Sequence, residues 1–288
     1  MTADASSVVV EGRGEPRTPS PTAAPGEAPS PPKQRTGSGL RTQALRVFVF
    51  ALILGLWQLA DGRWIPDYLI SSPASVAKTL WEYLTGVQPG LWQDVKVTGE
   101  ELLLGYALGV VGGLLIGLLL GYWRAGAAIF NPLITAINGI PKIALAPLFL
   151  IWFGIGIESK VAIASMTVFF VMFYNTYMGV MNMPANLVDV LRVMGANRYT
   201  VIRKVTLPQI SVPVLSGMKA SVPFAMIGVI VGEFIASQDG VGYLINTATQ
   251  NFDSATVFSG IVVLMAMITI GMILVGLLER RLLRWQRD

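Results

Sequence analysis

Six long apolar runs, separated by polar stretches, follow one another after residue 40 of this chain. A helix needs about 17–25 predominantly apolar residues to cross the hydrocarbon core of a bilayer, and each run meets or approaches that length. The pattern therefore predicts an all-α integral membrane protein with about six transmembrane helices. The predicted spans cover residues 44–60, 101–122, 127–153, 161–181, 214–235 and 257–278.

The third run is interrupted by helix-breaking residues and a charge. Pro141 and Pro147 remove backbone hydrogen bonds, and non-helical backbone at membrane depth needs protein or water around it. Lys142 is the one basic residue that cannot be placed near a membrane surface, and such residues are often functional. Either Pro141, Lys142 and Pro147 line a translocation path, or this is a kinked helix whose lysine reaches the cytoplasmic face or another subunit.

A polar and basic island separates the fourth and fifth runs. Asp189 lies in the first turn of its predicted helix, where negative charge is favoured, and Gly195 then breaks the helix. A second helical piece follows, and we expect Leu207–Pro208 to stop it. An amphipathic island of this kind either lies on the lipid headgroups or docks onto a partner.

Glycine recurs at every fourth position of the second run. Such a stripe lets a neighbouring helix approach closely, and it serves either static packing or a seam that slides during gating. The stripe consists of Gly105, Gly109, Gly113, Gly117 and Gly121.

The composition supports the membrane assignment and excludes several chemistries. The chain is 53% hydrophobic and 13% charged, whereas soluble domains carry about 25% charged residues. It contains no cysteine and no histidine, which excludes disulfides, thiolate catalysis, the usual zinc sites and histidine acid–base chemistry. We expect neither a cofactor nor a metal. Glu233, toward the outer end of the fifth span, is the one acid placed well inside a span and a second candidate for the path or a gate.

The distribution of basic residues predicts the orientation of the chain. With the N-terminus inside, sixteen of the 21 Lys and Arg residues fall on cytoplasmic segments and four on outer ones. The outer four are Arg63, Lys78, Lys96 and, in a predicted short outer turn at 154–160, Lys160. This bias places both termini and the island in the cytoplasm. It also explains the net charge of +4 without nucleic-acid binding.

The island resembles the cytoplasmic coupling motif of ABC importer permeases, often written E-A-A, three residues, G, then L-P. Asp189 takes the place of the glutamate, Gly195 and the following Ala196 are retained, and Leu207–Pro208 closes the motif. Val190 and Leu191 depart from the two alanines. The resemblance implies that these residues dock into a groove of an ATPase subunit.

Further segments extend the resemblance to the permeases for nitrate, sulfonate, taurine and thiamine-precursor uptake. They are Gly139–Leu148, Ile151–Gly156, Gly232–Phe234 and Gly240–Leu244. The resemblance implies a type I importer (MetI-like) core plus one preceding helix, in the plasma (inner) membrane of a prokaryote. It also implies two copies of an ABC ATPase subunit, an external solute-binding protein and a second permease copy. The chain has no G-x-x-x-x-G-K-[S/T] phosphate loop, so ATP hydrolysis is expected in the partner.

The expected function is uptake of a small solute, such as a small anion, sulfonate, nitrate or thiamine precursor, by alternating access. The rival interpretations are a gradient-driven secondary transporter with an amphipathic surface helix and, more remotely, a membrane enzyme. The expected organisation is a disordered cytoplasmic tail at 1–40, a first helix and external segment at 41–96, a permease core at 97–280 containing the coupling helix at 186–208, and a cytoplasmic tail at 281–288.

Overall fold

The computed structural model describes residues 39–62, 66–184, 190–191 and 193–283, and their regular structure is helical. Five helices are long and apolar enough to cross a membrane. They are α1 (Gly39–Ala60), α4 (Leu91–Tyr122), α7 (Ile157–Met181), the run containing α10 (Leu207–Ala236), and α12 (Ser254–Leu282). Shorter elements are α2 (Asp67–Ile70), α3 (Pro73–Leu84), α5 (Arg124–Asn138), η2 (Lys142–Leu145), α6 (Ala146–Phe153), α9 (Arg198–Val201), η3 (Ile202–Thr206) and α11 (Val241–Gln250).

The third predicted span is broken where the sequence indicated. The segments Pro132–Asn138 and Lys142–Phe153 meet at an angle of 81°, and together they bring the number of candidate spans to six. Pro147 lies in the first turn of α6, where its missing N–H costs nothing. The predicted all-helical fold with about six spans is confirmed.

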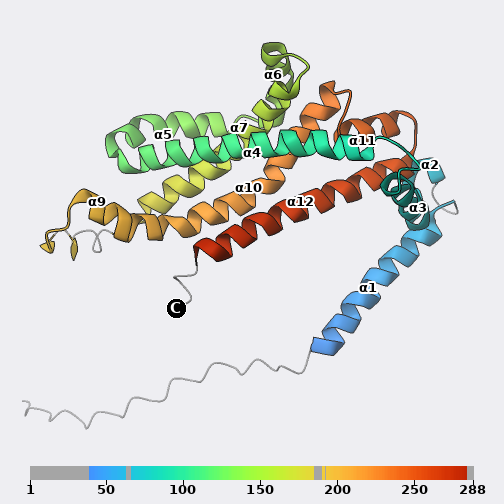
Figure 1. The fold of residues 1–288 in the computed structure, drawn as a ribbon, viewed down its shortest axis with the longest axis horizontal. Helices are drawn as coiled ribbons and strands as arrows, with labels where there is room; N and C mark the ends of the chain where they lie inside the picture. The colour runs from blue at the N-terminus through green and yellow to red at the C-terminus, as the bar shows by residue number, and fades with distance from the viewer. Residues whose placement is uncertain (1–38, 63–65, 185–189, 192, 284–288) are drawn as a thin grey trace, which may run out of the picture. The chain divides into compact units, whose positions relative to one another are not determined.

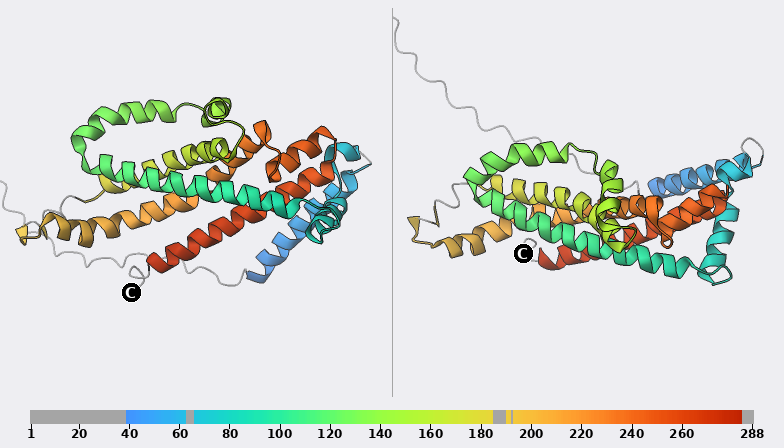
Figure 2. Two further views of the ribbon diagram at one scale, coloured as in Figure 1. Left: turned by 45° about the horizontal axis from the view of Figure 1, so that its top comes forward. Right: turned by 90° about the horizontal axis from the view of Figure 1, so that it is seen from above.

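The residues from Ala51 onward form one compact unit, and α7 lies in its middle, between α4 and α10 (Figures 1 and 2). The glycine stripe of α4 packs directly on α7. A β-carbon added at Gly109 would lie 2.5 Å from the Cβ of Val168, and one added at Gly121 would lie 2.7 Å from the Cβ of Val180. Each stripe glycine faces the α7 residue 59 positions later, so the two helices run parallel.

The opposite face of α7 packs on α10 in the antiparallel direction. A β-carbon at Gly232 would lie 2.8 Å from Cγ of Lys160, and one at Gly217 would lie 2.7 Å from the Cβ of Asn175. Glycine on both neighbours thus lets three helix backbones approach closely, and the resulting van der Waals packing favours helix association in lipid.

Three expectations about boundaries were wrong. Leu207–Pro208 does not stop a helix, because a continuous helical run extends from Tyr199 to Ala236. The π-helical turn η3 precedes Pro208, which lies in the first turn of α10; such a turn accommodates a residue that cannot donate a hydrogen bond. The helix α4 begins ten residues before Glu101, after Gly90 with φ of +112°. Lys160, assigned to an outer turn, lies inside α7 and is buried.

Candidate functional site

A buried ion pair joins the N-terminal parts of α4 and α7. Lys160 Nζ lies 2.8 Å from Glu101 Oε1, and the side chains are 8% and 1% exposed. Lys160 also donates to Ser237 Oγ at 2.7 Å, which connects the pair to the segment after α10. Oε2 of Glu101 is buried without a hydrogen-bond partner among the described residues, so this carboxylate depends on Lys160. Removing one member of such a pair leaves an uncompensated buried charge.

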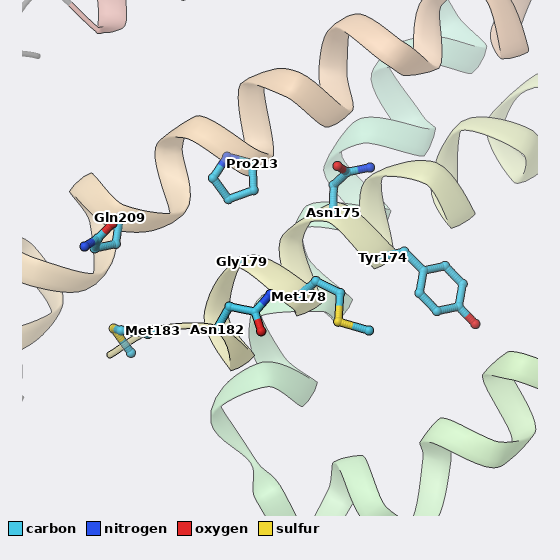
Figure 3. Close-up of a pocket in the computed structure, with 8 residues that line it drawn as sticks. All are labelled: Tyr174, Asn175, Met178, Gly179, Asn182, Met183, Gln209 and Pro213. Carbon is cyan, nitrogen blue, oxygen red and sulfur yellow. The ribbon is translucent and has the colours of Figure 1, made fainter. Parts of the chain in front are cut away.

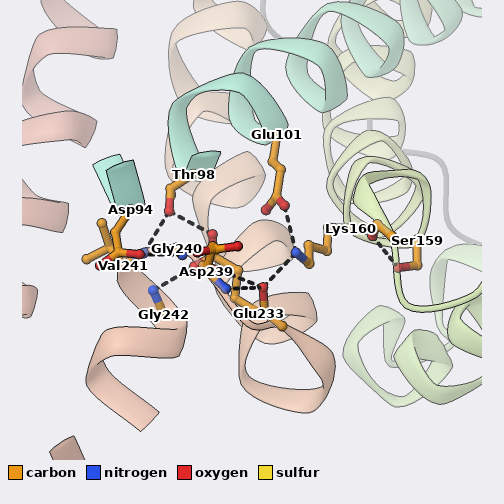
Figure 4. A network of polar contacts seen from close by, with 12 residues as sticks. Asp94, Thr98, Glu101, Ser159, Lys160, Glu233, Asp239, Gly240, Val241 and Gly242 are labelled. Atoms are coloured by element: carbon orange, nitrogen blue, oxygen red, sulfur yellow. Dashed lines mark hydrogen bonds and ion pairs between the residues drawn. The ribbon is translucent and has the colours of Figure 1, made fainter. Parts of the chain in front are cut away.

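The N-terminus of α11 is held by three side chains from two other helices (Figure 4). Gly240 N–H donates to Asp94 Oδ1 at 2.8 Å, Val241 N–H to Thr98 Oγ1 at 2.9 Å, and Gly242 N–H to Glu233 Oε2 at 2.6 Å. These N–H groups have no partner within their own helix, and carboxylates are favourable at a helix N-terminus. The segment Gly240–Gly242 is therefore bound to α4 and α10 by its backbone.

Thr98 links the N-terminus of α11 to Glu233 of α10. Its hydroxyl accepts from Val241 N–H and donates to Glu233 Oε1 at 2.7 Å. Glu233 itself is fully buried. The two glycines are needed here, because Gly240 has φ of +111° and a β-carbon at Gly242 would lie 2.6 Å from Glu233 Oε2. Four of these residues, Thr98, Glu101, Lys160 and Glu233, are buried, and Asp94 is partly buried. We call the five together the buried polar cluster.

Lys142 lies at the break between α5 and α6, apart from this cluster. Its Nζ donates to Asn138 O at 3.1 Å and to Asn138 Oδ1 at 2.8 Å, and it lies 4.8 Å from the centroid of the Phe170 ring. Pro141 occupies the N-cap position of the short helix η2, with an extended backbone. The contacts of Lys142 share no residue with those of Glu233, so the structure does not bring the two candidate path residues together.

The coupling segment, residues 186–208, connects α7 to α10. Asp189 lies outside the described residues. The predicted glycine break is present: Gly195 has φ of +81°, and nothing lies within 4 Å of a β-carbon added there. Ala196 N–H donates to Leu191 O at 2.9 Å, and Asn197 Oδ1 accepts from Thr200 N–H to start the next helical piece. Val193 and Met194 are 89% and 77% exposed, so an apolar surface flanks the turn.

A pocket of about 440 Å³ opens beside the coupling segment, between the last turns of α7 and the first turns of α10 (Figure 3). Amides, thioethers and a phenol line it, and no charged residue is among the lining side chains. We call it the amide pocket; its lining residues are Tyr174, Asn175, Met178, Gly179, Asn182, Met183, Gln209 and Pro213.

The sequence marks one member of the ion pair. Glu101 stands one turn before Gly105 and continues the glycine stripe, which indicates that it faces a neighbouring helix. The identity of its partner follows only from the structure, where the offset of 59 residues places Lys160 opposite it. Asp94 and Thr98 lie on the same face of α4, at helical spacing of seven and three residues before Glu101. The hydropathy pattern did not indicate that Asp94 and Thr98 belong to this helix, because the predicted span begins at Glu101.

Comparisons with known proteins identify the relatives of this chain. Residues 109–284 match the family model described as binding-protein-dependent transport system inner membrane component. A Bacillus subtilis protein named for aliphatic sulfonates transport, SsuC, is 30% identical over 83% of this chain and 86% of its own length. The riboflavin transport system permease protein RibX of Chloroflexus aurantiacus is 35% identical over 82% of this chain and 87% of its own.

The fold is also similar to a solved structure. An inward-facing structure of the MetNI methionine ABC transporter superposes with a TM-score of 0.58 over 66% of this chain and 95% of that chain, at 18% identity. At this identity the likeness concerns the fold alone.

Proposed function

The chain belongs to the family of binding-protein-dependent transport system inner membrane components, and from this premise we propose that it moves a small solute into the cell by ATP-driven alternating access. As a member of this family it is a multi-pass inner membrane permease subunit rather than an enzyme. The observation that carries the proposal is the exposed glycine turn at Gly195, which lies in the chain between α7 and α10, two helices that pack closely on each other.

Docking is the first step of the proposed mechanism. Gly195 and Ala196 form an open turn with no side chain larger than a methyl group to obstruct a partner, and exposed Val193 and Met194 offer apolar contact area. Asp189 precedes the turn, and Leu207–Pro208 follow it at the start of α10. We infer that this surface enters a groove of a nucleotide-hydrolysing subunit.

Transmission is the second step. The coupling segment continues on one side into α7 and on the other, without a helical break, into α10. Both helices pack on each other through glycines, so a displacement of the turn moves them as one body. ATP binding would close two docked ATPase subunits, draw two such bodies together and switch the spans from inward-facing to outward-facing.

The path and the gate occupy different places in this proposal. Pro141, Lys142 and Pro147 stand where the third span breaks, which is where non-helical backbone must contact protein or water. Glu233 holds the segment Gly240–Gly242 and would act as part of an outer gate rather than as a contact for the solute.

The assembly follows from the same proposal. A homodimer of this chain would pair with two ATPase copies inside and with a solute-binding protein outside, and both termini would be cytoplasmic. Two of the relatives are named for the transport of sulfonates and of riboflavin. We therefore propose an organic solute in that size range.

The test is Gly195→Trp in the full-length chain, isolated from its native membrane in mild detergent. We expect the variant to reach the membrane, to lose its co-purifying ATPase subunit and to abolish uptake, because an indole fills the docking turn. Gly86→Trp is a matched control, since Gly86 has φ of +77° and equally open surroundings. It should keep the partner and the uptake. A wild-type chain that purifies alone would instead support a gradient-driven transporter.

A further inference from the structure

One face of α7 connects the break in the third span to the amide pocket. Phe170, Tyr174 and Met178 follow each other at intervals of four residues, and Asn182 continues the series at the end of the helix. Lys142 lies 4.8 Å above the ring of Phe170, at one end of this face. Tyr174, Met178 and Asn182 line the pocket at the other end, about 12 Å farther along the helix from Phe170 to Met178 at about 1.5 Å per residue.

Lys142 is a cation whose described neighbours include no acid within ion-pair distance. Among the residues that the structure describes, no carboxylate lies within 4.0 Å of its ammonium group, although Lys160 has one at 2.8 Å. Its partners are the carbonyl groups of Asn138 and the Phe170 ring, which orient it but leave its charge uncompensated. A partly buried cation of this kind is stabilised when an anion comes near.

The amide pocket suits weak, reversible contact with such an anion. Its amides can donate hydrogen bonds, its two methionines and its tyrosine ring accept an apolar or planar body, and no carboxylate repels a negative charge. A volume of about 440 Å³ lies within the usual range for a small organic ligand. A conducting site must bind well enough to admit the solute and weakly enough to release it.

We propose that Lys142, this face of α7 and the amide pocket form the inner part of the solute path, and that they take a small organic monoanion. The anionic group passes Lys142, and the neutral pocket beside the coupling segment receives the solute before release. This inference rests on the proposed transport function and adds the side chains and the charge of the solute.

The absence of native cysteine makes the path directly testable. Met178→Cys is made in the full-length chain, which is isolated in mild detergent with any subunits that remain bound and placed in lipid nanodiscs. It is treated with 2-sulfonatoethyl methanethiosulfonate, an anion. A parallel sample receives the 2-(trimethylammonio)ethyl reagent, a cation. Mass spectrometry gives the two rates of modification. Leu115→Cys, which is 59% exposed on α4 away from this face, is the control.

We expect Met178→Cys to react faster than the control and to favour the anionic reagent. Adding Lys142→Gln should lower the anion-to-cation ratio roughly threefold or more, while Lys142→Arg should preserve it, because one charge acts over roughly 10 Å. An unchanged ratio in Lys142→Gln, an equal drop in Lys142→Arg, or reaction no faster than the control would overturn the proposal. Labelling does not require ATP hydrolysis, so failure of the coupling experiment alone would leave this result intact.

Discussion

The two ends of α7 differ in how they are held. Near its beginning, Lys160 is buried, ion-paired with Glu101 and hydrogen-bonded to Ser237. Near its end, Met178 and Met181 are about half exposed, and the helix opens onto the amide pocket. Close glycine contacts run along the whole length between these ends. The difference indicates that the buried polar cluster fixes the geometry of α4, α7, α10 and α11, whereas the pocket end is free to adapt to a partner or a solute.

The largest effect is expected at the ion pair. Lys160→Met leaves Glu101 buried without its counter-charge and should lower the free energy of unfolding by about 3–5 kcal/mol. The measurement is the apparent melting temperature of the purified protein in detergent. Adding Glu101→Gln removes the stranded charge and should restore most of the loss. A single variant as stable as the wild type would mean that this end of α7 is not held by the pair.

An intermediate effect is expected at Thr98. Thr98→Val leaves the N–H of Val241 without its acceptor and Oε1 of Glu233 without the donor that Thr98 supplies, which should cost about 1–3 kcal/mol. Amide hydrogen exchange should speed up at the start of α11. Thr98→Ser keeps the hydroxyl and should retain most of the protection. Equal exchange rates in the Val and Ser variants would show that the hydroxyl of Thr98 does not hold the segment Gly240–Gly242 in place.

The smallest effect on stability is expected at the pocket end. Gln209 is exposed, and its side chain makes no hydrogen bond to another residue in the described part of the chain, so Gln209→Ala should change the free energy of unfolding by less than about 0.5 kcal/mol. The apparent melting temperature of the variant should equal that of the wild type, whereas its rate of solute uptake should fall. A loss of stability comparable to that of Thr98→Val would show that both ends of α7 are structurally fixed, against the contrast drawn above.

Local patterns were enough to predict the spans and their breaks. Apolar runs of bilayer length can only be helices in lipid, and Gly139 and Pro141 stand at the break between Asn138 and Lys142, so the 81° bend could be placed from the sequence. Proline alone does not decide this, because Pro132, Pro213 and Pro223 lie inside helices that continue. The turn at Gly195 could likewise be predicted from the sequence, because its φ of +81° suits glycine and few other residues. The resemblance of its surroundings to a coupling motif led to the family that the comparisons confirm.

Only the tertiary structure decided which polar residues meet. The sequence placed Lys160 in an outer turn, because hydropathy is averaged over a window and does not report that a buried acid faces this lysine. The parallel alignment of α4 and α7, with 59 residues between partners, brings Glu101 to Lys160, and the return of the chain after α10 brings Gly240–Gly242 to Asp94, Thr98 and Glu233. Apart from Gly242 and Glu233, which are nine positions apart, these contacts join residues more than 50 positions apart. Sequence thus determined where helices form, and the packing of glycine faces determined which charges are buried together.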